Sequence, residues 1–458
     1  MRDRPVHRLA ARSSPSSERF GPKSTACASG STDSPRRTSP PSFHSAGRPT
    51  SGHVAVGDAL FRKTEDGYRA AFPKVEIEFA IDRLRWDRHE LFGQLSVSCG
   101  LAGARTVEDG LVSAGTFNFS STRARRDRAR EIADRVRAKP PIDFVGLLEE
   151  VSYGVLRAEL HGEPAVLLRT VVPVRDEEFT LDGFAFPKRH ATILFGDGDS
   201  LKSFLALWVL GRLAGDGWKV ALFDWELDAS THHVRLRRLF SDAMPDVRYV
   251  RCDRPLVQEV DRLRRIVRDE QLDFAVYDSI GFACPGPPEA AEHALGYFRA
   301  ARQVGVGALH IAHVRQGEDN DLKPFGSAFW HNGCRSSWCA KRADDEAAAH
   351  IGLYHRKANL SARHPAAAFT VTFSETQTEI TPTSIAAISA LAEYAPLWQR
   401  MKDALTRGPL TLVDLAKELD AKVETLDRTV RRKSGLFTRV SAFKDGITRI
   451  ALVERRAS

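Results

Sequence analysis

One loop of eight residues has the composition and surroundings of a phosphate-binding site. It consists of Gly196, Asp197, Gly198, Asp199, Ser200, Leu201, Lys202 and Ser203. An apolar run, 191–195, precedes it and an apolar helical pattern follows it, which is the strand, loop and helix order that a phosphate loop requires. There, backbone N–H groups at a helix N-terminus surround phosphates, a lysine reaches the β and γ oxygens, and a hydroxyl binds Mg²⁺. This loop, called the P-loop below, is therefore expected to bind ATP, with Ser203 as a ligand of Mg²⁺.

The P-loop departs from the usual pattern at one position. The common sequence is G-x-x-x-x-G-K-S/T, and Leu201 stands where the second glycine is expected. Read alone, the string also fits a chance turn. Its identification therefore rests on the flanking strand and helix, and on three further motifs that follow in order along the chain.

Carboxylates gather after the next expected strand. Asp224, Glu226 and Asp228 occupy alternate positions, which share one face of an extended segment. The three carboxylates are thus expected to point toward one region. Alternatively, one or more of them caps the following helix, which suits Asp228 because Ala229 and Ser230 come next.

Two later strands end in polar residues. The run 272–278 is apolar and ends in Asp278, the Walker B arrangement, which places a carboxylate beside Mg²⁺ and its waters. The run 309–313 ends in His313, which should emerge at the carboxyl edge of a parallel sheet, beside the γ-phosphate. We interpret Asp278 as a metal ligand and His313 as a sensor of hydrolysis. An ordinary polar residue at a strand end is the alternative for His313.

The order of these motifs resembles the RecA superfamily, and within it the hexameric replicative helicases, especially the RepA-like branch of plasmid, phage and mobile-element ATPases. The matching stretches are 196–203, 224–226, 278–279, 312–314, 326–327 with 332–338, and 356–359, within residues 176–382. The resemblance implies a RecA-type core that hydrolyses ATP with Mg²⁺, assembles as a homo-oligomeric, hexameric ring and acts on DNA. It also implies Glu226 as the general base, with Asp224 as second choice, and a catalytic part for Lys202.

A basic residue that one subunit inserts into its neighbour's site is a further implication of this resemblance. Many hexameric helicases carry K-x-R on a late strand, whereas this chain has Asn359 in place of the arginine. Lys357 is therefore the expected trans-acting residue, with Arg356 and Arg335 as alternatives. The charged loop 315–325 is expected to line a central channel.

The P-loop and the acidic strands require an α/β core. Strands and helices alternate in the β-α-β manner, which predicts a RecA-like domain at 176–382 with a mostly parallel sheet covered by helices. The expected strands are 191–195, 219–223, 247–251, 274–277, 308–311, 349–355, 369–373 and 378–381, and the expected helices are 202–214, 255–269 and 288–303.

The N-terminal part divides in two. Residues 1–53 are rich in Ser, Pro, Arg and Gly without apolar periodicity, which predicts a disordered basic tail. A transit peptide, a mis-assigned start and a tail that contacts DNA remain open for this segment. Residues 54–175 are expected to form an α+β accessory domain, with strands at 75–81 and 91–98 and helices at 122–137 and 143–159. The arginine run 123–130 is interpreted as a solvated helix face, with phosphate contact as the alternative.

Residues 383–458 are expected to form a winged helix-turn-helix domain. Helices at 397–404, from 411 and at 423–432 precede a hairpin of 437–440 and 447–453. In this arrangement the third helix enters the major groove of DNA and the wing contacts the backbone. The expected DNA-binding residues are Lys422, Thr425, Arg428, Arg431, Arg432 and Lys444. A protein–protein module is the alternative.

Composition restricts the functional class further. No apolar run reaches 18 residues and no CxxC pair occurs among the six cysteines, so we expect a soluble, cytoplasmic protein that does not associate with membranes. Residues 1–53 carry a net charge of 9 − 3 = +6 and residues 394–458 carry 14 − 8 = +6, within a total of +8. Basic ends around an acidic middle suit DNA binding. The leading hypothesis is a ring-forming DNA helicase or translocase in mobile-element replication. An ATP-controlled DNA-binding switch or loader, and a recombination or repair ATPase, are the alternatives.

Overall fold

The computed structural model describes residues 59–162, 164–174, 177–314, 324, 326–441 and 446–453. The predictions for the tail 1–53, for the loop 315–325 apart from residue 324, and for Lys444 fall outside these residues. The chain divides into two compact units, 1–160 and 161–458, and each is described by itself.

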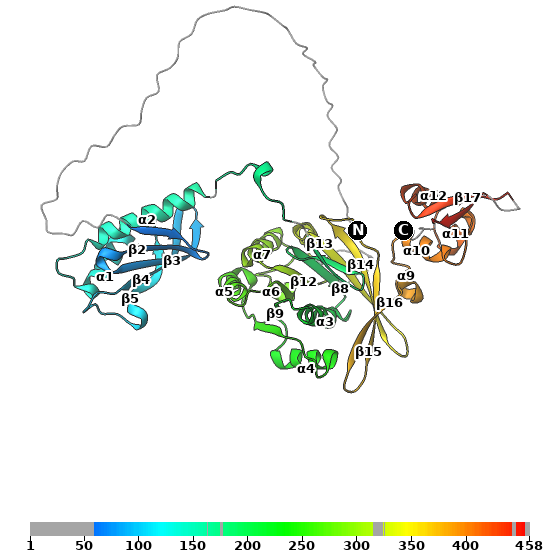
Figure 1. Cartoon of the computed structure of the whole chain (residues 1–458), viewed down its shortest axis with the longest axis horizontal. Coiled ribbons are helices and arrows are strands. Elements are labelled where there is room, and N and C mark those ends of the chain that lie inside the picture. Colours follow the sequence, from blue (N-terminus) through cyan, green and yellow to red (C-terminus); the bar gives the residue numbers. More distant parts are fainter. Residues whose placement is uncertain are drawn as a thin grey trace, which may run out of the picture. The chain divides into compact units, whose positions relative to one another are not determined.

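The first unit contains an antiparallel sheet. Its five strands, counted among the described residues, pair in chain order. They are β1 (Leu60–Lys63), β2 (Gly67–Phe72), β3 (Ile77–Asp87), β4 (Glu90–Cys99) and β5 (Leu111–Asn118). Along β4 and the first half of β3 every second side chain is buried, and these side chains belong to one core cluster with helices α1 (Thr122–Val136) and α2 (Phe144–His161). Both helices lie against the sheet (Figure 1). Because successive side chains of a strand point to opposite faces, the buried ones all lie on the face that the helices cover.

The arginine-rich helix α1 has a structural task that the sequence did not indicate. Arg125 donates to the Phe119 carbonyl and pairs with Glu149 of α2, and Arg128 donates to Ser113 of β5. By contrast, Arg123 keeps 92% of its side chain exposed. The run is therefore only partly a solvated face, because two of its arginines fasten α1 to its neighbours.

The second unit is built on a mixed, mainly parallel sheet. Its order is β10-β9-β11-β12-β8-β13-β14-β15-β16, nine strands in the part of the chain that the structure describes. Pairing is parallel from β10 to β13 and antiparallel from β13 to β16. The strands are β8 (Ala191–Gly196), β9 (Val220–Asp224), β10 (Val247–Arg251), β11 (Phe274–Asp278), β12 (Gly307–His313), β13 (Ser336–Asp344), β14 (Ala349–Ala358), β15 (Ala367–Phe373) and β16 (Thr378–Thr383).

Helices cover both faces of this sheet (Figure 1). One face packs against α3 (Lys202–Gly215) and α4 (Ala229–Phe240). The other packs against α5 (Leu256–Asp269), α6 (Ile280–Ala283), α7 (Ala291–Val304) and α8 (Ala328–Gly333). A short hairpin of β6 (Glu178–Leu181) and β7 (Phe184–Pro187) precedes β8. Central strands such as β11 are buried at every position because each face is covered.

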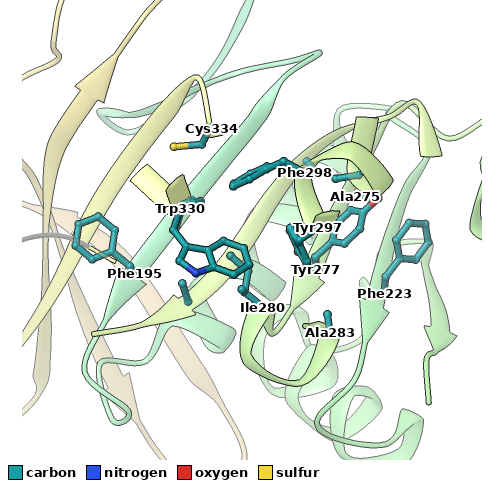
Figure 2. Packing of buried hydrophobic residues seen from close by; sticks show 14 of the residues in the cluster. Phe195, Phe223, Ala275, Tyr277, Ile280, Ala283, Tyr297, Phe298, Trp330 and Cys334 are labelled. Carbon is teal, nitrogen blue, oxygen red and sulfur yellow. The ribbon is translucent and has the colours of Figure 1, made fainter. Parts of the chain in front are cut away.

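Aromatic rings fill the core between the sheet and helices α7 and α8. Figure 2 shows Tyr277, Tyr297, Phe298 and Trp330 in this cluster. The hydroxyl of Tyr297 lies 2.8 Å from Nδ1 of His310, and burial lowers the pKa of that histidine to about 3. His310 is therefore a neutral core residue, although the neighbouring His313 lies at the sheet edge.

The C-terminal part is a small helical bundle with a hairpin. Its elements are α9 (Ser389–Ala392), α10 (Leu397–Leu405), α11 (Leu412–Glu418), α12 (Val423–Arg432), β17 (Phe437–Val440) and β18 (Arg449–Leu452). Thr411 caps α11 by accepting the Asp414 amide at 3.1 Å, as the sequence predicts. Gln399 of α10 makes two hydrogen bonds with the backbone of Ala366.

Most elements of the second unit agree with the sequence-based expectations, but several were missed. Strands β1, β2 and β5 of the first unit were not expected, nor were β6, β7, β13 and the short helices α6, α8 and α9 of the second. Helix α4 was anticipated only as the helix that Asp228 would cap, and α7 begins at Ala291 rather than 288. The sequence 336–344 was missed because its buried half and exposed half together show no simple alternation. In the described residues no helix has the length and apolarity that crossing a membrane requires.

Candidate nucleotide-binding site

The P-loop lies where the sequence predicts, between the end of β8 and the start of α3. Gly196 ends the strand, and a Cβ at this position would stand 2.4 Å from the Ala340 carbonyl oxygen of the neighbouring strand. Glycine is therefore required by close backbone packing. Helix α3 begins at Lys202, so the N–H groups of its first turn face the loop, which suits an anionic ligand.

Lys202 is folded into the P-loop. Its amine donates to the carbonyls of Gly196 (3.0 Å) and Asp197 (2.6 Å) and to Ser200 Oγ (3.1 Å). Burial lowers the pKa of Lys202 to about 8, against the attraction of Asp278, Asp197 and Glu226. The buried amine thus stands among oxygen acceptors that a phosphate could replace.

Leu201 has the backbone conformation that the usual glycine would supply. Its φ is 58° and its ψ is 22°, in the left-handed region. For a residue with a side chain this conformation costs about 1–2 kcal/mol. The Leu201 side chain packs against the core cluster beneath α3, so apolar contact offsets part of that cost. Leu201 therefore differs from the motif in residue type but keeps the left-handed backbone conformation.

Ser203 and Asp278 form the candidate metal site. Ser203 lies beside the Asp278 carboxylate and counteracts part of the rise in its pKa, and Oδ1 of Asp278 is buried without a hydrogen-bond partner among the described residues. Burial raises the pKa of Asp278 to about 6, and Glu226 and Asp224 add to this shift. An oxygen pair with one free, buried acceptor fits Mg²⁺, which prefers hard oxygen ligands.

Glu226 and Asp224 have different surroundings although Asp224 ends β9 and Glu226 follows two residues later. Asp224 is fully buried and its oxygens accept the amides of Glu226 and Leu227 at 3.0–3.2 Å. Glu226 is exposed, and its charge acts on both Lys202 and Asp278. Of the two carboxylates, only Glu226 is open to a water molecule.

Asp228 has a different role from Asp224 and Glu226. Its carboxylate accepts the Thr231 amide at 2.9 Å and the Thr231 hydroxyl at 2.8 Å, and it is the N-cap of α4. The capping alternative is therefore correct for this residue.

His313 stands next to the P-loop. It pairs in register with Gly196, and the following residue, Val314, donates its N–H to the Gly196 carbonyl at 3.2 Å. Burial, and then the charge of Lys202, lower the pKa of His313. A neutral imidazole at this point can hydrogen-bond a group bound in the loop.

The strand order joins these residues at one edge. Strand β12, which carries His313, lies between the P-loop strand β8 and the Asp278 strand β11, and β9 with Glu226 lies beyond β11. The carboxyl ends of these parallel strands thus meet around the P-loop. This is the mainly parallel α/β fold with a P-loop that the sequence predicts.

Comparisons with known proteins add little to this description. No protein-family model and no curated protein match the chain. Among solved structures, it is similar to a KaiC-like protein from the hyperthermophilic archaeon Pyrococcus horikoshii OT3. The similarity has 15% identity and a TM-score of 0.35, over 43% of this chain and 91% of that one. At these values the similarity does not identify the family of this chain.

Lys357 does not join the site of its own subunit. Its amine donates to the carbonyls of His331 (2.7 Å) and Asn332 (3.0 Å) near the end of α8. The β-ladder places it level with Ser337 and hence with Ile193. Because Ile193 precedes Gly196 by three residues, Lys357 is displaced by about 10 Å along the sheet.

Arg342 was missed by the sequence analysis. It lies on β13, and its Nη1 is 2.8 Å from Asp199 Oδ2 and 3.1 Å from the Asp199 carbonyl, while its Nε is 2.8 Å from Asp344. Arg342 therefore holds the acidic tip of the P-loop. Nothing in the local sequence of 336–344 signals this contact, because it forms between residues 143 positions apart.

The residues expected to bind DNA lie on one surface of α12. Lys422, Thr425, Arg428, Arg431 and Arg432 are all exposed, while Leu426 and Val430 are buried. Val423, in the first turn of α12, is 37% exposed. Asp427 pairs with both Arg431 and Arg439, so part of this basic surface is neutralised from within.

Proposed function

We propose that this protein binds ATP with Mg²⁺ at the P-loop and hydrolyses it. The observation that carries the proposal is the convergence of Lys202, Asp278 and the exposed Glu226 at one sheet edge, where each changes the electrostatic environment of another. Lys202 and the amides at the start of α3 would bind the phosphates. Glu226 would orient and deprotonate the attacking water, since it is the exposed carboxylate beside the loop.

Ser203 and Asp278 are the residues that would hold Mg²⁺. The ion would neutralise charge on the phosphate oxygens. His313, in register with Gly196, would hydrogen-bond the terminal phosphate and so report its presence to β12. The main chain of α3 and β8 keeps these groups in place during the reaction.

The first test separates binding from hydrolysis. Lys202→Ala should abolish binding of a fluorescent ATP analogue. Glu226→Gln should bind the analogue normally but lower kcat by about 10²–10⁴-fold, the usual contribution of a general base. Full turnover in Glu226→Gln would contradict the assigned base, and unchanged binding in Lys202→Ala would contradict the site itself.

We further propose that the ATPase acts on DNA, as a ring-forming helicase or translocase in the replication of a mobile element. The elements α10, α11 and α12 with the β17–β18 hairpin have the order of a winged helix, and α12 carries an exposed basic face. Such a face can contact phosphates and base edges in the major groove. The basic ends of the chain support the same partner.

Turnover and strand separation test this second proposal. Single-stranded DNA should raise the rate of ATP hydrolysis, and the protein should separate a forked duplex. The paired change Arg428→Ala and Arg432→Ala should weaken DNA binding and flatten its salt dependence, while leaving basal hydrolysis unchanged. Affinity that does not respond to the paired change would favour a protein-binding module.

A specific observation supports an alternative, the ATP-controlled DNA-binding switch. The expected trans-acting residue, Lys357, is hydrogen-bonded to two carbonyls of its own subunit, and Asn359 occupies the position of the usual arginine. Without a basic residue at the transferring phosphate, hydrolysis would be slow. Tight ATP binding without DNA-stimulated turnover would favour this switch over the motor.

A further inference from the structure

The segment that carries Glu226 is held by a buried network centred on Asp224. Asp224 ends β9 and has no exposed surface. Its register partners are Asp278 on one side and Arg251 on the other, so it lies between the candidate metal site and β10. A fully buried carboxylate is costly unless every oxygen is hydrogen-bonded, which makes its partners informative.

Two of the partners are the amides around Glu226. Asp224 Oδ1 accepts the Glu226 N–H at 3.0 Å and the Leu227 N–H at 3.2 Å, and Oδ2 accepts the Leu227 N–H at 3.2 Å. On the preceding side, the N–H of Trp225 donates to the Asp278 carbonyl at 2.7 Å. The backbone is thus fixed immediately before and after Glu226, while its side chain remains exposed.

The other partners come from α4 and β10. His232 of α4 places Nε2 3.3 Å from Asp224 Oδ2, and the Tyr249 hydroxyl of β10 lies 3.1 Å from the same oxygen. The Tyr249 oxygen is also 3.1 Å from the Leu227 carbonyl, to which Arg251 donates. Burial alone would raise the pKa of Asp224, but the close contact with His232 and the hydrogen bonds from the two amides outweigh it and lower the pKa. Asp224 therefore stays ionised and keeps both oxygens as acceptors.

We infer that Asp224, His232 and Tyr249 are positioning residues that orient Glu226 toward the attacking water. The inference rests on the proposed function, since it assigns these residues to the hydrolytic step of the same site. It replaces the second-choice general base by a different role, because Asp224 has no exposed oxygen with which to accept a proton from water. A small error in the placement of Glu226 would slow the chemical step without disturbing the phosphates, which bind at the P-loop.

The test compares two changes that each delete one hydrogen-bonded tyrosine hydroxyl. Tyr249→Phe removes the hydroxyl next to Asp224. Tyr354→Phe removes a hydroxyl that donates to the Leu391 carbonyl at 2.7 Å, in a different part of the core. Tyr249→Phe should lower kcat by about 10-fold, with an unchanged dissociation constant for ATP, because misplacement of a catalytic group affects mainly the reaction step. Tyr354→Phe should change the melting temperature but not kcat.

A double change distinguishes positioning from general loosening. In single-turnover measurements, adding Tyr249→Phe to Glu226→Gln should lower the residual rate by less than about 2-fold, because both changes remove the same contribution. An additive effect would overturn the inference. Asp224→Asn is a second variant, which keeps the shape but replaces one of the two acceptor oxygens with an NH₂ donor. It should reduce kcat more than Tyr249→Phe, and normal kcat in folded Asp224→Asn would also overturn the inference.

The outcomes separate this inference from the proposed function. If the unaltered protein hydrolyses ATP and Lys202→Ala does not bind it, but Tyr249→Phe has normal kcat, only the positioning inference fails. If the unaltered protein binds ATP without turnover, hydrolysis is excluded as its function and the positioning inference fails with it.

Discussion

At the scale of single residues, Leu201 shows how the motif tolerates a departure. What the position requires is a left-handed backbone at the start of α3, which glycine adopts freely and leucine adopts at a cost. The side chain is retained in contact with the core under the helix. The left-handed backbone and the apolar contact of the side chain therefore both limit which residue fits at position 201.

This requirement can be measured by comparing Leu201→Gly with Leu201→Ala. Both changes remove the same apolar contact, but only glycine relieves the positive φ. The glycine variant should be more stable by about 1 kcal/mol in urea unfolding, the reverse of the usual order of the two residues in helices. If the alanine variant is the more stable, then Leu201 does not have a left-handed backbone conformation in the protein.

Arg342 is the residue-scale feature that links the P-loop to β13. Asp199 places a negative charge near the expected phosphates, and Arg342 pairs with it at 2.8 Å. Arg342→Ala should weaken ATP binding by up to about 5-fold, because a partly exposed ion pair contributes at most about 1 kcal/mol. Asp199→Asn should bind ATP at least as well as the unaltered protein.

Isothermal titration at two salt concentrations checks this prediction. The effect of Arg342→Ala should shrink at high salt, since exposed charges are screened. Combining Arg342→Ala with Asp199→Asn should restore most of the affinity. Weak binding in the combined variant would mean that Arg342 contacts the nucleotide itself.

At the scale of elements, the junction of β13 and β14 depends on a neutral histidine. The His355 ring stacks on Trp338 with centroids 4.3 Å apart. Its Nδ1 accepts the His364 N–H at 2.9 Å, and its Nε2 lies 3.1 Å from Ser336 Oγ. Burial, and then the charge of His364, lower the pKa of His355 to about 4.

This shift predicts acid sensitivity with a defined sign. The unfolded chain binds a proton near pH 6.5, whereas folded His355 does so only near pH 4, so the stabilisation is complete above pH 6.5 and is lost as the pH falls toward 4. The loss attributable to His355 is up to about 3 kcal/mol. His355→Gln should show a shallower decline in the free energy of unfolding between pH 7 and 5. If the free energy of unfolding declined equally steeply with falling pH in both proteins, this would contradict a neutral His355 in the folded state.

At the scale of the whole molecule, the site is assembled from strands distant in sequence, and Lys357, the expected trans-acting residue, lies away from it. Glu226, Asp278, His313 and the P-loop meet at one sheet edge, whereas Lys357 is about 10 Å along the sheet from the level of Gly196. If Lys357 takes part in hydrolysis, it must therefore act on the site of another subunit. Whether Lys357 contributes to hydrolysis therefore depends on assembly of the protein.

Mass photometry of the full chain with ATP and DNA tests assembly. A six-fold species should appear with both ligands and should be lost in Lys202→Ala, because binding of ATP would drive ring formation. Lys357→Ala should still assemble but hydrolyse ATP slowly. A persistent monomer under all conditions would count against the ring.

The sequence by itself determined most of the strands and helices between β8 and β12 and the position of the P-loop, because short-range apolar patterns and the residues at strand ends are local properties. Tertiary structure decided which of these residues meet. It buried Asp224 but left Glu226 exposed. It brought Arg342 into contact with Asp199, 143 positions away in the sequence. It placed Lys357 away from the P-loop. Strand order and side-chain burial depend on contacts between distant segments, so no local pattern could specify them.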